Sequence, residues 1–316
     1  MHTRTRITVA ALALWTPFGL PAAAARSQFQ DRGTATAARI DSSLAAAARY
    51  LLRNQSSDGA WRSKTYACFK DGPSLTGLVL SAMFFMPQGG KPAMKQSFKR
   101  GADYLVRMVG EDGSIEAGEH GLNFPVLSAA SASRVVVLLE KTPANLAAQQ
   151  VWLKFMRSYQ LNEKLGWSPS DPQFGGWGFS IKPPRKPKPG EIRESFAESN
   201  MVATIFAIGA LRSAKIPADD PVWDDVLTFV VRCQNYADGA PDVRFDDGGF
   251  FFIPMDPVQN KAGVAGIDAH GRTRFHSYGS MTADGLRALA RCGLPSDHPR
   301  VQAARRWLLN NLSAQH

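Results

Sequence analysis

The sequence predicts an all-α protein whose helices form an outer and an inner layer. Three observations lead to this prediction: prolines that precede helix-like stretches, an alternation of amphipathic with wholly apolar stretches, and a repeated pattern of glutamine, glycine and an aromatic residue between them. Of the 316 residues, 44% are hydrophobic and 20% are charged, which is enough apolar material for a substantial core. The composition excludes a chain that is disordered along its whole length.

Residues 1–25 are expected to be a signal peptide. The segment begins with two basic residues, Arg4 and Arg6, continues with an apolar run over 7–15, and ends in small residues at 22–25. This is the order of a secretory signal, so we expect an exported protein, periplasmic or secreted. A short membrane anchor that stays attached is the alternative.

The remaining chain is expected to comprise a linker, 26–39, and a helical repeat domain, 40–316. No later apolar run reaches the roughly 18 residues that a membrane span needs, so no transmembrane segment is expected in the mature chain. The net charge of +10 is weak support for nucleic acid, which is not expected as a partner. Three cysteines are too few for a disulfide framework and lack zinc-ribbon spacing: Cys68, Cys233 and Cys292.

Prolines mark most of the expected helix starts, because a residue without an N–H loses no hydrogen bond in the first turn. Another helix is expected to open at Ser195, where Glu198 three residues later completes a capping box, and another near Ser277. With residues 41–54, nine helices are expected. Six prolines precede a helix-like stretch of about 13 residues or more: Pro73, Pro92, Pro125, Pro143, Pro221 and Pro299.

The expected helices are of two kinds that alternate along the chain. Residues 41–54 are amphipathic, with Leu44 and Leu51 on an apolar stripe and Arg49 facing away. The stretch 201–211 is apolar nearly all round, so other helices must surround it. Alternating half-exposed and fully buried helices are what two concentric layers would produce.

A repeated pattern marks the joints between the two kinds of helix. The glutamine is expected to bind backbone groups where one helix ends, while the aromatic ring excludes water. A single copy would be interpreted as an ordinary helix C-cap, but four copies indicate a repeat. An aromatic residue precedes a glutamine by five positions at Tyr50 and Gln55, Phe155 and Gln160, and Phe229 and Gln234. A glycine leads an apolar residue by two positions at Gly59 and Trp61, Gly113 and Ile115, Gly175 and Trp177, and Gly248 and Phe250.

The best preserved copy, Ala48 to Trp61, reads ARYLLRNQSSDGAW. It resembles the QW motif of squalene-hopene cyclases, oxidosqualene cyclases and the β subunits of protein prenyltransferases. The resemblance covers residues 40–312 or so, and it implies an α/α toroid with inner and outer helices around a central funnel. About four hairpins plus a final outer helix at 299–312 are fewer than a closed barrel of that family contains, so we expect an open or incomplete ring.

The catalytic motifs that this resemblance implies are missing. The cyclases protonate an alkene with an Asp-x-Asp-Asp motif, whereas the aspartate pairs here, such as Asp219-Asp220 and Asp224-Asp225, have other spacings. The prenyltransferases hold zinc with an Asp-x-Cys pair, and no cysteine here has an aspartate two residues before it. The sequence therefore predicts the fold of the family without its chemistry.

The long connections are expected to lie on one rim of the fold. Segments from an outer to an inner helix are long, at about 62–72, 161–194 and 236–276, whereas returning segments such as 87–91 and 293–298 are short. The long loops then lie beside the N-termini of the inner helices. Because helix N-termini carry partial positive charge, this rim should favour anionic or carbonyl groups.

The last long loop holds the candidate catalytic residues. A histidine is a candidate general base, and two histidines with a carboxylate are candidate metal ligands, but their spacing is not a recognised ligand pattern, so no metal and no cofactor is expected. The competing interpretation is structural, with Arg272 or Arg274 paired to one of the aspartates and the tyrosine in a capping segment. The candidates are Asp246, Asp247, His270, His276 and Tyr278.

Two classes of function remain. The first is an exported binding protein that holds an apolar, isoprenoid-like ligand or a protein partner, as expected from a repeat framework without catalysts. The alternative is an enzyme of unassigned reaction, terpenoid cyclase-like, transferase-like or active on glycans, that uses residues of the last loop. Cyclisation in particular would need an acid in the funnel outside the usual motif. The basic, proline-rich stretch 182–190 is expected to be an extended, solvated loop.

Overall fold

The computed structural model describes residues 37–66, 69–118, 121–191 and 196–312. The expected signal peptide, most of the expected linker and Cys68 lie outside these residues. The chain divides into two compact units after Ala47. Of the first unit the structure describes only the beginning of helix α2 (Ala37–Arg53), and all other elements belong to the second unit.

Helices dominate the described residues, which confirms the all-α prediction. These residues form nine α-helices, two short 3-10 helices and one antiparallel two-stranded hairpin. After α2 the α-helices are α3 (Pro73–Phe85), α4 (Pro92–Arg107), α5 (Pro125–Val136), α6 (Pro143–Arg157), α7 (Met201–Ser213), α8 (Val222–Arg232), α9 (Gly279–Arg291) and α10 (Pro299–Asn311). The remaining elements are η3 (Pro87–Gly90), η4 (Glu163–Leu165), β1 (Val264–Ile267) and β2 (Thr273–Phe275).

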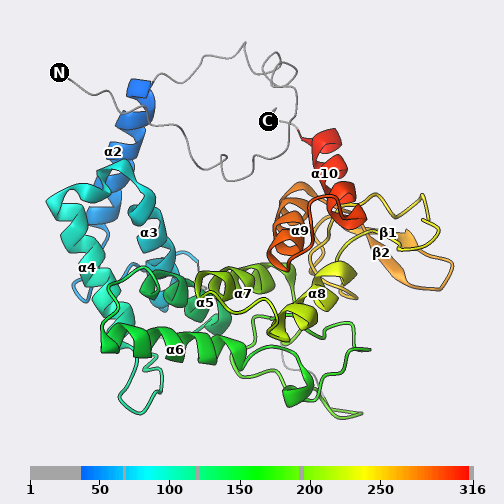
Figure 1. The fold of residues 1–316 in the computed structure, drawn as a ribbon, viewed down its shortest axis with the longest axis horizontal. Coiled ribbons are helices and arrows are strands. Elements are labelled where there is room, and N and C mark those ends of the chain that lie inside the picture. Colours follow the sequence, from blue (N-terminus) through cyan, green and yellow to red (C-terminus); the bar gives the residue numbers. More distant parts are fainter. Residues whose placement is uncertain (1–36, 67–68, 119–120, 192–195, 313–316) are drawn as a thin grey trace. The chain divides into compact units, whose positions relative to one another are not determined.

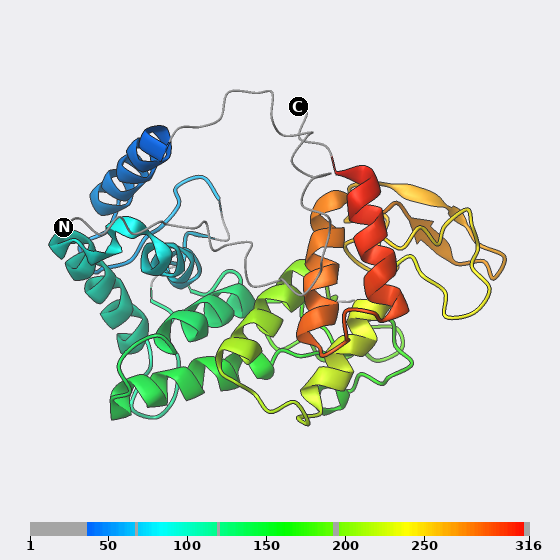
Figure 2. The same cartoon turned by 45° about the horizontal axis from the view of Figure 1, so that its top comes forward.

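Two layers of helices alternate along the second unit (Figure 1). The inner layer consists of α3, α5, α7 and α9, each packed against the next, and the outer helices α4, α6, α8 and α10 each pack against the inner helix before them. Figure 2 shows the same succession from a second direction. The contacts run in one order from α3 to α9, and the toroid that the resemblance implies stays a prediction.

The proline signals locate six helix starts correctly. Proline occupies the first turn of α3, α4, α5, α6 and α10, and Pro221 caps α8. The expected start at Ser195 is wrong. α7 begins at Met201, because the side chain of Asn200 accepts a hydrogen bond from the Ala203 N–H at 2.9 Å and forms the N-cap. Ser195 itself lies outside the described residues.

Burial separates the two layers as expected, with one exception. In α7, Val202, Phe206 and the last turn keep some exposure, and the rest of the helix is buried. Inner helix α9 differs, because Asp284, Arg287 and Arg291 make it amphipathic. The prediction of wholly apolar inner helices therefore fails at α9, which carries charge on its uncovered side.

The glutamines form the expected hydrogen bonds at three of the four joints. Two of them also donate to the next outer helix, Gln55 to the Ser97 carbonyl at 2.9 Å and Gln234 to the Arg300 carbonyl at 2.9 Å. The glutamines therefore tie each outer helix to the loop that follows it. Their shared acceptor is the joint glycine: Gln55 Nε2 donates to Gly59 O (2.8 Å), Gln160 Nε2 to Gly175 O (3.0 Å) and Gln234 Nε2 to Gly248 O (3.1 Å).

The tryptophans complete these joints from the other side. The buried indole of Trp61 donates to the Leu51 carbonyl at 2.8 Å, and that of Trp177 donates to the Met156 carbonyl at 2.8 Å. Both acceptors are in the last turn of the helix before the joint, α2 or α6, where carbonyls lack helical partners. At three joints the backbone N–H of the aromatic residue donates to the hydroxyl of a threonine in the next inner helix: Trp61 to Thr76, Trp177 to Thr204 and Phe250 to Thr282.

At the second joint, a tryptophan from a different helix donates the corresponding hydrogen bond. Ile115 has no N–H in its side chain, and it bridges to Val109 through the backbone. The carbonyl of Leu105, which corresponds to Leu51 of the first joint, instead accepts a hydrogen bond from the indole of Trp152 at 3.0 Å. Trp152 comes from the next outer helix, α6, and it is fully buried.

Glycine is required at the joints because the loop lies against the next outer helix. Gly59 has φ +99°, and a Cβ there would lie 2.4 Å from the Arg100 carbonyl oxygen of α4. Gly175 has φ +91°, and a Cβ there would lie 1.8 Å from the Asp225 carbonyl oxygen of α8. Any other residue would be strained in conformation and would clash with backbone.

Candidate functional sites on the loop rim

The long loops meet beside the inner helices, as the sequence predicts. The rings of Phe124 and Phe179 lie 5.2 Å apart and join the loop between α4 and α5 to the loop between α6 and α7. The Met201 N–H, at the start of α7, donates to the Phe252 carbonyl of the last loop at 3.0 Å. These contacts place the last loop, which holds the candidate catalytic residues, next to the start of α7.

Asp246 is paired with Arg274 inside the last loop. The Arg274 guanidinium donates to Asp246 Oδ1 at 2.6 Å, and the side chains are 14% and 5% exposed. The other oxygen of Asp246 accepts the Asp242 N–H at 2.8 Å. The structural interpretation of this aspartate is confirmed, because its charge is neutralised and its oxygens are occupied.

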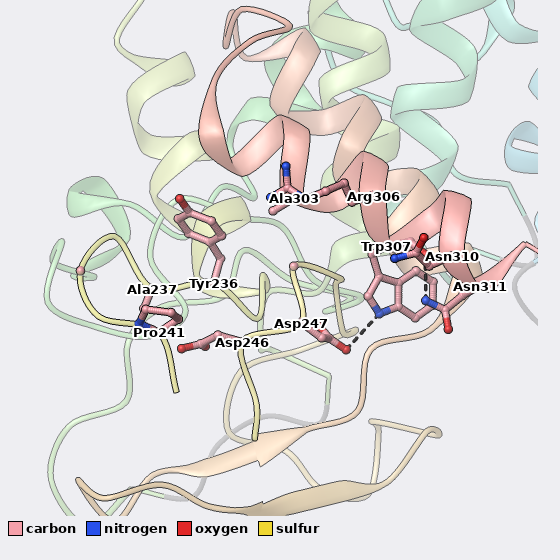
Figure 3. Close-up of a pocket in the computed structure, with 12 residues that line it drawn as sticks. Tyr236, Ala237, Pro241, Asp246, Asp247, Ala303, Arg306, Trp307, Asn310 and Asn311 are labelled. Atoms are coloured by element: carbon pink, nitrogen blue, oxygen red, sulfur yellow. Dashed lines mark hydrogen bonds between the residues drawn. The ribbon is translucent and has the colours of Figure 1, made fainter. Parts of the chain in front are cut away.

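Asp247 connects the last loop to α10 (Figure 3). Its Oδ1 accepts hydrogen bonds from Ser277 Oγ at 2.7 Å and the Gly249 N–H at 2.9 Å, and its Oδ2 accepts the Trp307 indole at 2.9 Å. No arginine pairs with Asp247 among the described residues. Three donors around one carboxylate hold the end of the loop against the last helix.

Asp268 is a further buried aspartate of the same loop. Its side chain, 3% exposed, pairs with Arg272 at 2.8 Å and lies 3.5 Å from Arg274. Burial acts to raise the pKa of Asp268, but the backbone N–H groups of Arg272 and His270, together with the Arg272 side chain, outweigh it and lower the pKa to about 2. Arg272 therefore pairs with Asp268 and not with Asp246 or Asp247.

The structure does not assemble the histidines and the tyrosine into a catalytic group. His270 and His276 are exposed. Within the described residues no group of three histidine, cysteine, aspartate or glutamate side chains is placed to hold a metal ion. Tyr278 is the N-cap of α9, is half-buried, and burial raises its pKa to about 12.

Two grooves lie beside these residues and share Asp246. The groove in Figure 3 has a volume of about 710 Å³ and is lined by Asp247, Trp307 and Arg306 among others. A second groove of about 890 Å³ is lined by His270 and the arginines around Asp268. Both grooves are open to solvent and contain charged side chains, so neither is the enclosed apolar cavity expected for an isoprenoid.

Asp71 is a candidate that the sequence analysis missed. It precedes Gly72 and Pro73, at the start of the first inner helix, and it is 2% exposed. Its carboxylate accepts hydrogen bonds from Ser128 Oγ of α5 at 2.7 Å and Ser74 Oγ of α3 at 3.1 Å. The only available signal was an acidic residue directly before a helix predicted to be buried.

The surroundings of Asp71 favour its protonated form. Burial raises the pKa of Asp71, and the serine and backbone hydrogen bonds oppose this effect only in part. Arg62, which lines the same groove, is paired with Asp58 at 2.6 Å. Asp71, Arg62 and Glu116 all line a groove of about 500 Å³, so a buried acid lies beside a polar groove at the first loop.

The proline-rich stretch 182–190 forms no helix or strand, as expected, but it is anchored to an earlier part of its own loop, around residues 167–171. The Trp167 indole donates to the Pro184 carbonyl at 2.6 Å, and Lys186 pairs with Asp171 at 2.7 Å. Trp167 belongs to a small separate apolar cluster with Leu161. The expectation of a fully solvated loop is therefore wrong for the residues around Pro184, which is buried.

Two comparisons of the sequence with known proteins find no match. A scan of the sequence against protein-family models finds no match, and a search of curated proteins finds none either. Among the described residues, no helix combines the length and the apolar character needed to cross a membrane.

Proposed function

We propose that this protein is an exported member of the QW-repeat family of terpenoid cyclases and protein prenyltransferases, and that it binds an apolar, isoprenoid-like ligand without transforming it. The binding proposal is carried by one observation. Half-exposed apolar side chains remain on the inner helices α3 and α7, at the edge of the apolar core. Membership of the family is supported by the hydrogen bonds at the joints.

The apolar positions form a stripe on each of two inner helices. On α7, Val202 and Phe206 are four residues apart and lie on one face, and they are the half-exposed apolar side chains of an otherwise buried helix. On α3, Leu75 and Leu78 are three residues apart and are also half-exposed. Such side chains gain free energy when an apolar ligand covers them.

The candidate catalytic residues of the last loop support binding and not catalysis. Asp246 is neutralised by Arg274, and Asp247 is held by Ser277 and Trp307. A general acid or base needs an oxygen or nitrogen that can reach the substrate. Both aspartates instead use their oxygens to hold the loop together.

The stripe on α7 gives a direct test of ligand binding. Farnesol and squalene are the probes, and their binding is measured by quenching of tryptophan fluorescence. A variant with Val202→Ser and Phe206→Ser should bind farnesol roughly 10-fold to 100-fold more weakly, because several buried CH₂ groups lose their contacts. The matched control is Ile181→Ser with Val243→Ser, two exposed apolar residues of the loops. Equal binding by both variants would refute the proposal.

A protein partner is the second form of the binding proposal. The last loop exposes Val243, Met255 and Val258, with relative exposures of 91%, 69% and 88%, and large exposed apolar groups on one loop are typical of contact surfaces. Met255→Asp with Val258→Asp should then abolish capture of a partner in a pull-down from the native host while leaving farnesol binding unchanged. Capture that is unaffected would exclude this loop as the surface.

Asp71 favours the enzymatic alternative. A buried carboxyl with a raised pKa is suited to donate a proton, and cyclisation requires an acid of this kind. The test incubates the purified protein with squalene and with lipid extracts, with and without divalent metals, and analyses products by mass spectrometry. A product that Asp71→Asn abolishes and His276→Ala preserves would establish catalysis at the first loop and reject the purely binding role.

A further inference from the structure

Four arginines gather at the C-terminal ends of the inner helices, away from the loop rim. Arg134 lies in the last turn of α5, Arg212 in that of α7 and Arg291 in that of α9, with Arg287 one turn earlier in α9. Since α5 packs on α7 and α7 on α9, the three helix ends are neighbours. The candidate sites of the rim do not include any of these residues.

Gly209 of α7 lies at the centre of this arginine cluster. A Cβ at Gly209 would be 3.5 Å from Arg134 Cδ, 3.6 Å from Arg134 Nη1 and 3.5 Å from Arg291 Nη1. The two guanidinium groups therefore come within about 7 Å of each other over the glycine. Gly209 follows Phe206 by three residues, so the cluster continues the apolar stripe of α7.

Two of the arginines have no partner among the described residues. The guanidinium groups of Arg134 and Arg291 are half-buried, and neither forms a hydrogen bond or an ion pair there. Arg212, by contrast, donates to the Arg291 carbonyl and stacks over the Trp223 ring at 4.1 Å. Arg287 pairs with Asp284 at 3.0 Å.

The free guanidinium groups are electrostatically unfavourable as they stand. Burial lowers the pKa of Arg134, and the charge of Arg287 lowers it further. Burial also lowers the pKa of Arg291, and repulsion from Arg287, Arg134 and Arg212 adds to this effect, which the charge of Asp284 opposes only in part. Half-buried like charges of this kind need a counter-charge.

The helix dipoles do not supply that counter-charge in full. Each helix C-terminus is equivalent to about −0.5 charge, so three ends contribute about −1.5. Four arginines and Asp284 carry a net charge of +3. A surplus of about +1.5 remains, which a multiply charged anion would offset.

We propose that Arg134 and Arg291 form a binding site for an oxyanion of the phosphate type, over Gly209. The planar guanidinium fork fits the oxygens of such a group. Resting on the proposed function, we assign this site to the anionic end of the ligand whose apolar part covers Val202 and Phe206. The anion has two candidate sources, a free phosphate and the head group of an amphiphile.

Three probes distinguish these sources at constant ionic strength. Inorganic phosphate tests the anion site alone, dodecanol tests the apolar stripe alone, and dodecyl phosphate, used below its micellar concentration, tests both. Binding is measured by calorimetry with the wild type and with Arg134→Gln plus Arg291→Gln. The matched control, Lys182→Gln plus Arg185→Gln, removes the same charge from the exposed proline-rich loop.

The wild type should bind dodecyl phosphate roughly 10-fold to 100-fold more tightly than dodecanol, because a hydrogen bond to a charged group contributes this much. The double arginine variant should bind both equally, and the control should behave as the wild type. Inorganic phosphate should raise the Tm of the wild type and the control only. Arg134→Lys, which keeps the charge but loses the fork, should bind dodecyl phosphate with intermediate affinity.

The outcomes separate the two proposals. Equal binding of dodecanol and dodecyl phosphate by the wild type, or equal phosphate binding by the wild type and the double variant, would overturn the anion site and leave the apolar stripe standing. Phosphate binding that depends on the arginines, without any binding of dodecanol or dodecyl phosphate, would confirm the anion site and remove the proposed apolar ligand.

Discussion

The first and the last long loops both bury aspartates, but the first loop surrounds its aspartate with neutral groups, whereas the last loop pairs its aspartates with arginines. In the last loop, Asp246 lies against Arg274, and Asp268 lies between Arg272 and Arg274. In the first loop, Asp71 is held by neutral hydroxyl groups and backbone N–H groups. Burial acts to raise both carboxyl pKa values, and it prevails at Asp71, whereas the hydrogen bonds and the arginine prevail at Asp268.

This difference shows which carboxylates hold the fold and which are available for chemistry. An aspartate with an arginine partner stays ionised and fixes a loop, because removal of either partner leaves a buried charge. An aspartate held by hydroxyl groups exchanges its proton at higher pH and is the better candidate for a site. The number of acidic residues in a loop therefore does not by itself identify the better candidate for a site.

The largest loss of stability is expected when the buried arginine of the last loop is replaced. Arg274→Met should cost about 3 to 5 kcal/mol of unfolding free energy, because it leaves Asp246 buried without a cation. The matched control is Arg244→Met. Arg244 pairs with Asp242, but the arginine side chain is exposed, so this pair should contribute less than about 1 kcal/mol. Urea unfolding measures both. Similar small losses would mean that the last loop does not depend on charge pairing.

The buried and the exposed aromatic residues of the joints should also differ in their contribution to stability. Trp61→Ala in the first joint and Trp177→Ala in the third should each cost about 3 to 5 kcal/mol, because each removes a buried indole and its hydrogen bond to the preceding helix. Tyr50→Ala, in the same copy of the motif as Trp61 but 60% exposed, should change stability by less than about 0.5 kcal/mol. Thermal unfolding that does not respond to the tryptophan substitutions would contradict the assigned joints.

The sequence predicts the joints well because their requirements are local. Gln160 donates to the carbonyl of Gly175, which is 15 residues away within the same joint. Gly175 must be a glycine because its φ is positive and the backbone of the next outer helix lies against it. The sequence also predicts that an arginine of the last loop pairs with an aspartate such as Asp246, because both residues lie in one loop, but it does not specify which arginine. The start of α7 was missed, since the cap that prevails is Asn200 and not Ser195.

Asp71 and the arginine cluster depend on packing between distant segments, so the sequence pattern does not reveal them. Ser128, the strongest partner of Asp71, is 57 residues away. Arg134 and Arg291 become neighbours because α5 and α9 both pack on α7, beside Gly209. An isolated charged residue near the end of an apolar helix gives no periodic signal from which such an approach can be predicted.

The pH dependence of stability should have opposite signs at the two loops. The pKa of Asp268 is lowered to about 2, so its contribution is present above its unfolded pKa of about 3.9 and is lost as the pH falls towards 2. The pKa of Asp71 is raised, so its contribution is complete below about pH 3.9 and is lost as the pH rises through the folded value. Tm measurements of Asp71→Asn and Asp268→Asn at pH 3 and pH 7 test this contrast.

Asp71→Asn should be more stable than the wild type at pH 7 and gain less at pH 3, because the amide carries no charge to bury. Asp268→Asn should be less stable than the wild type at pH 7, and the difference should shrink at pH 3. If Asp71→Asn were destabilised most at pH 7, the carboxylate would be ionised there with an opposite charge nearby, and the contrast between the loops would be lost.

The smallest losses of stability are expected when one serine hydroxyl is removed beside each of the two loops. Ser128→Ala should cost about 1 to 1.5 kcal/mol, because Asp71 has no cation and loses its shortest hydrogen bond. Ser277→Ala should cost about 0.5 kcal/mol, because Asp247 keeps the Gly249 N–H and the Trp307 indole. The cost of Ser128→Ala should also depend on pH, because this variant removes a donor from a carboxyl whose pKa is raised. Its cost, measured by urea unfolding, should therefore grow from pH 3 to pH 7, whereas equal costs at both values would mean that Asp71 stays protonated throughout this range.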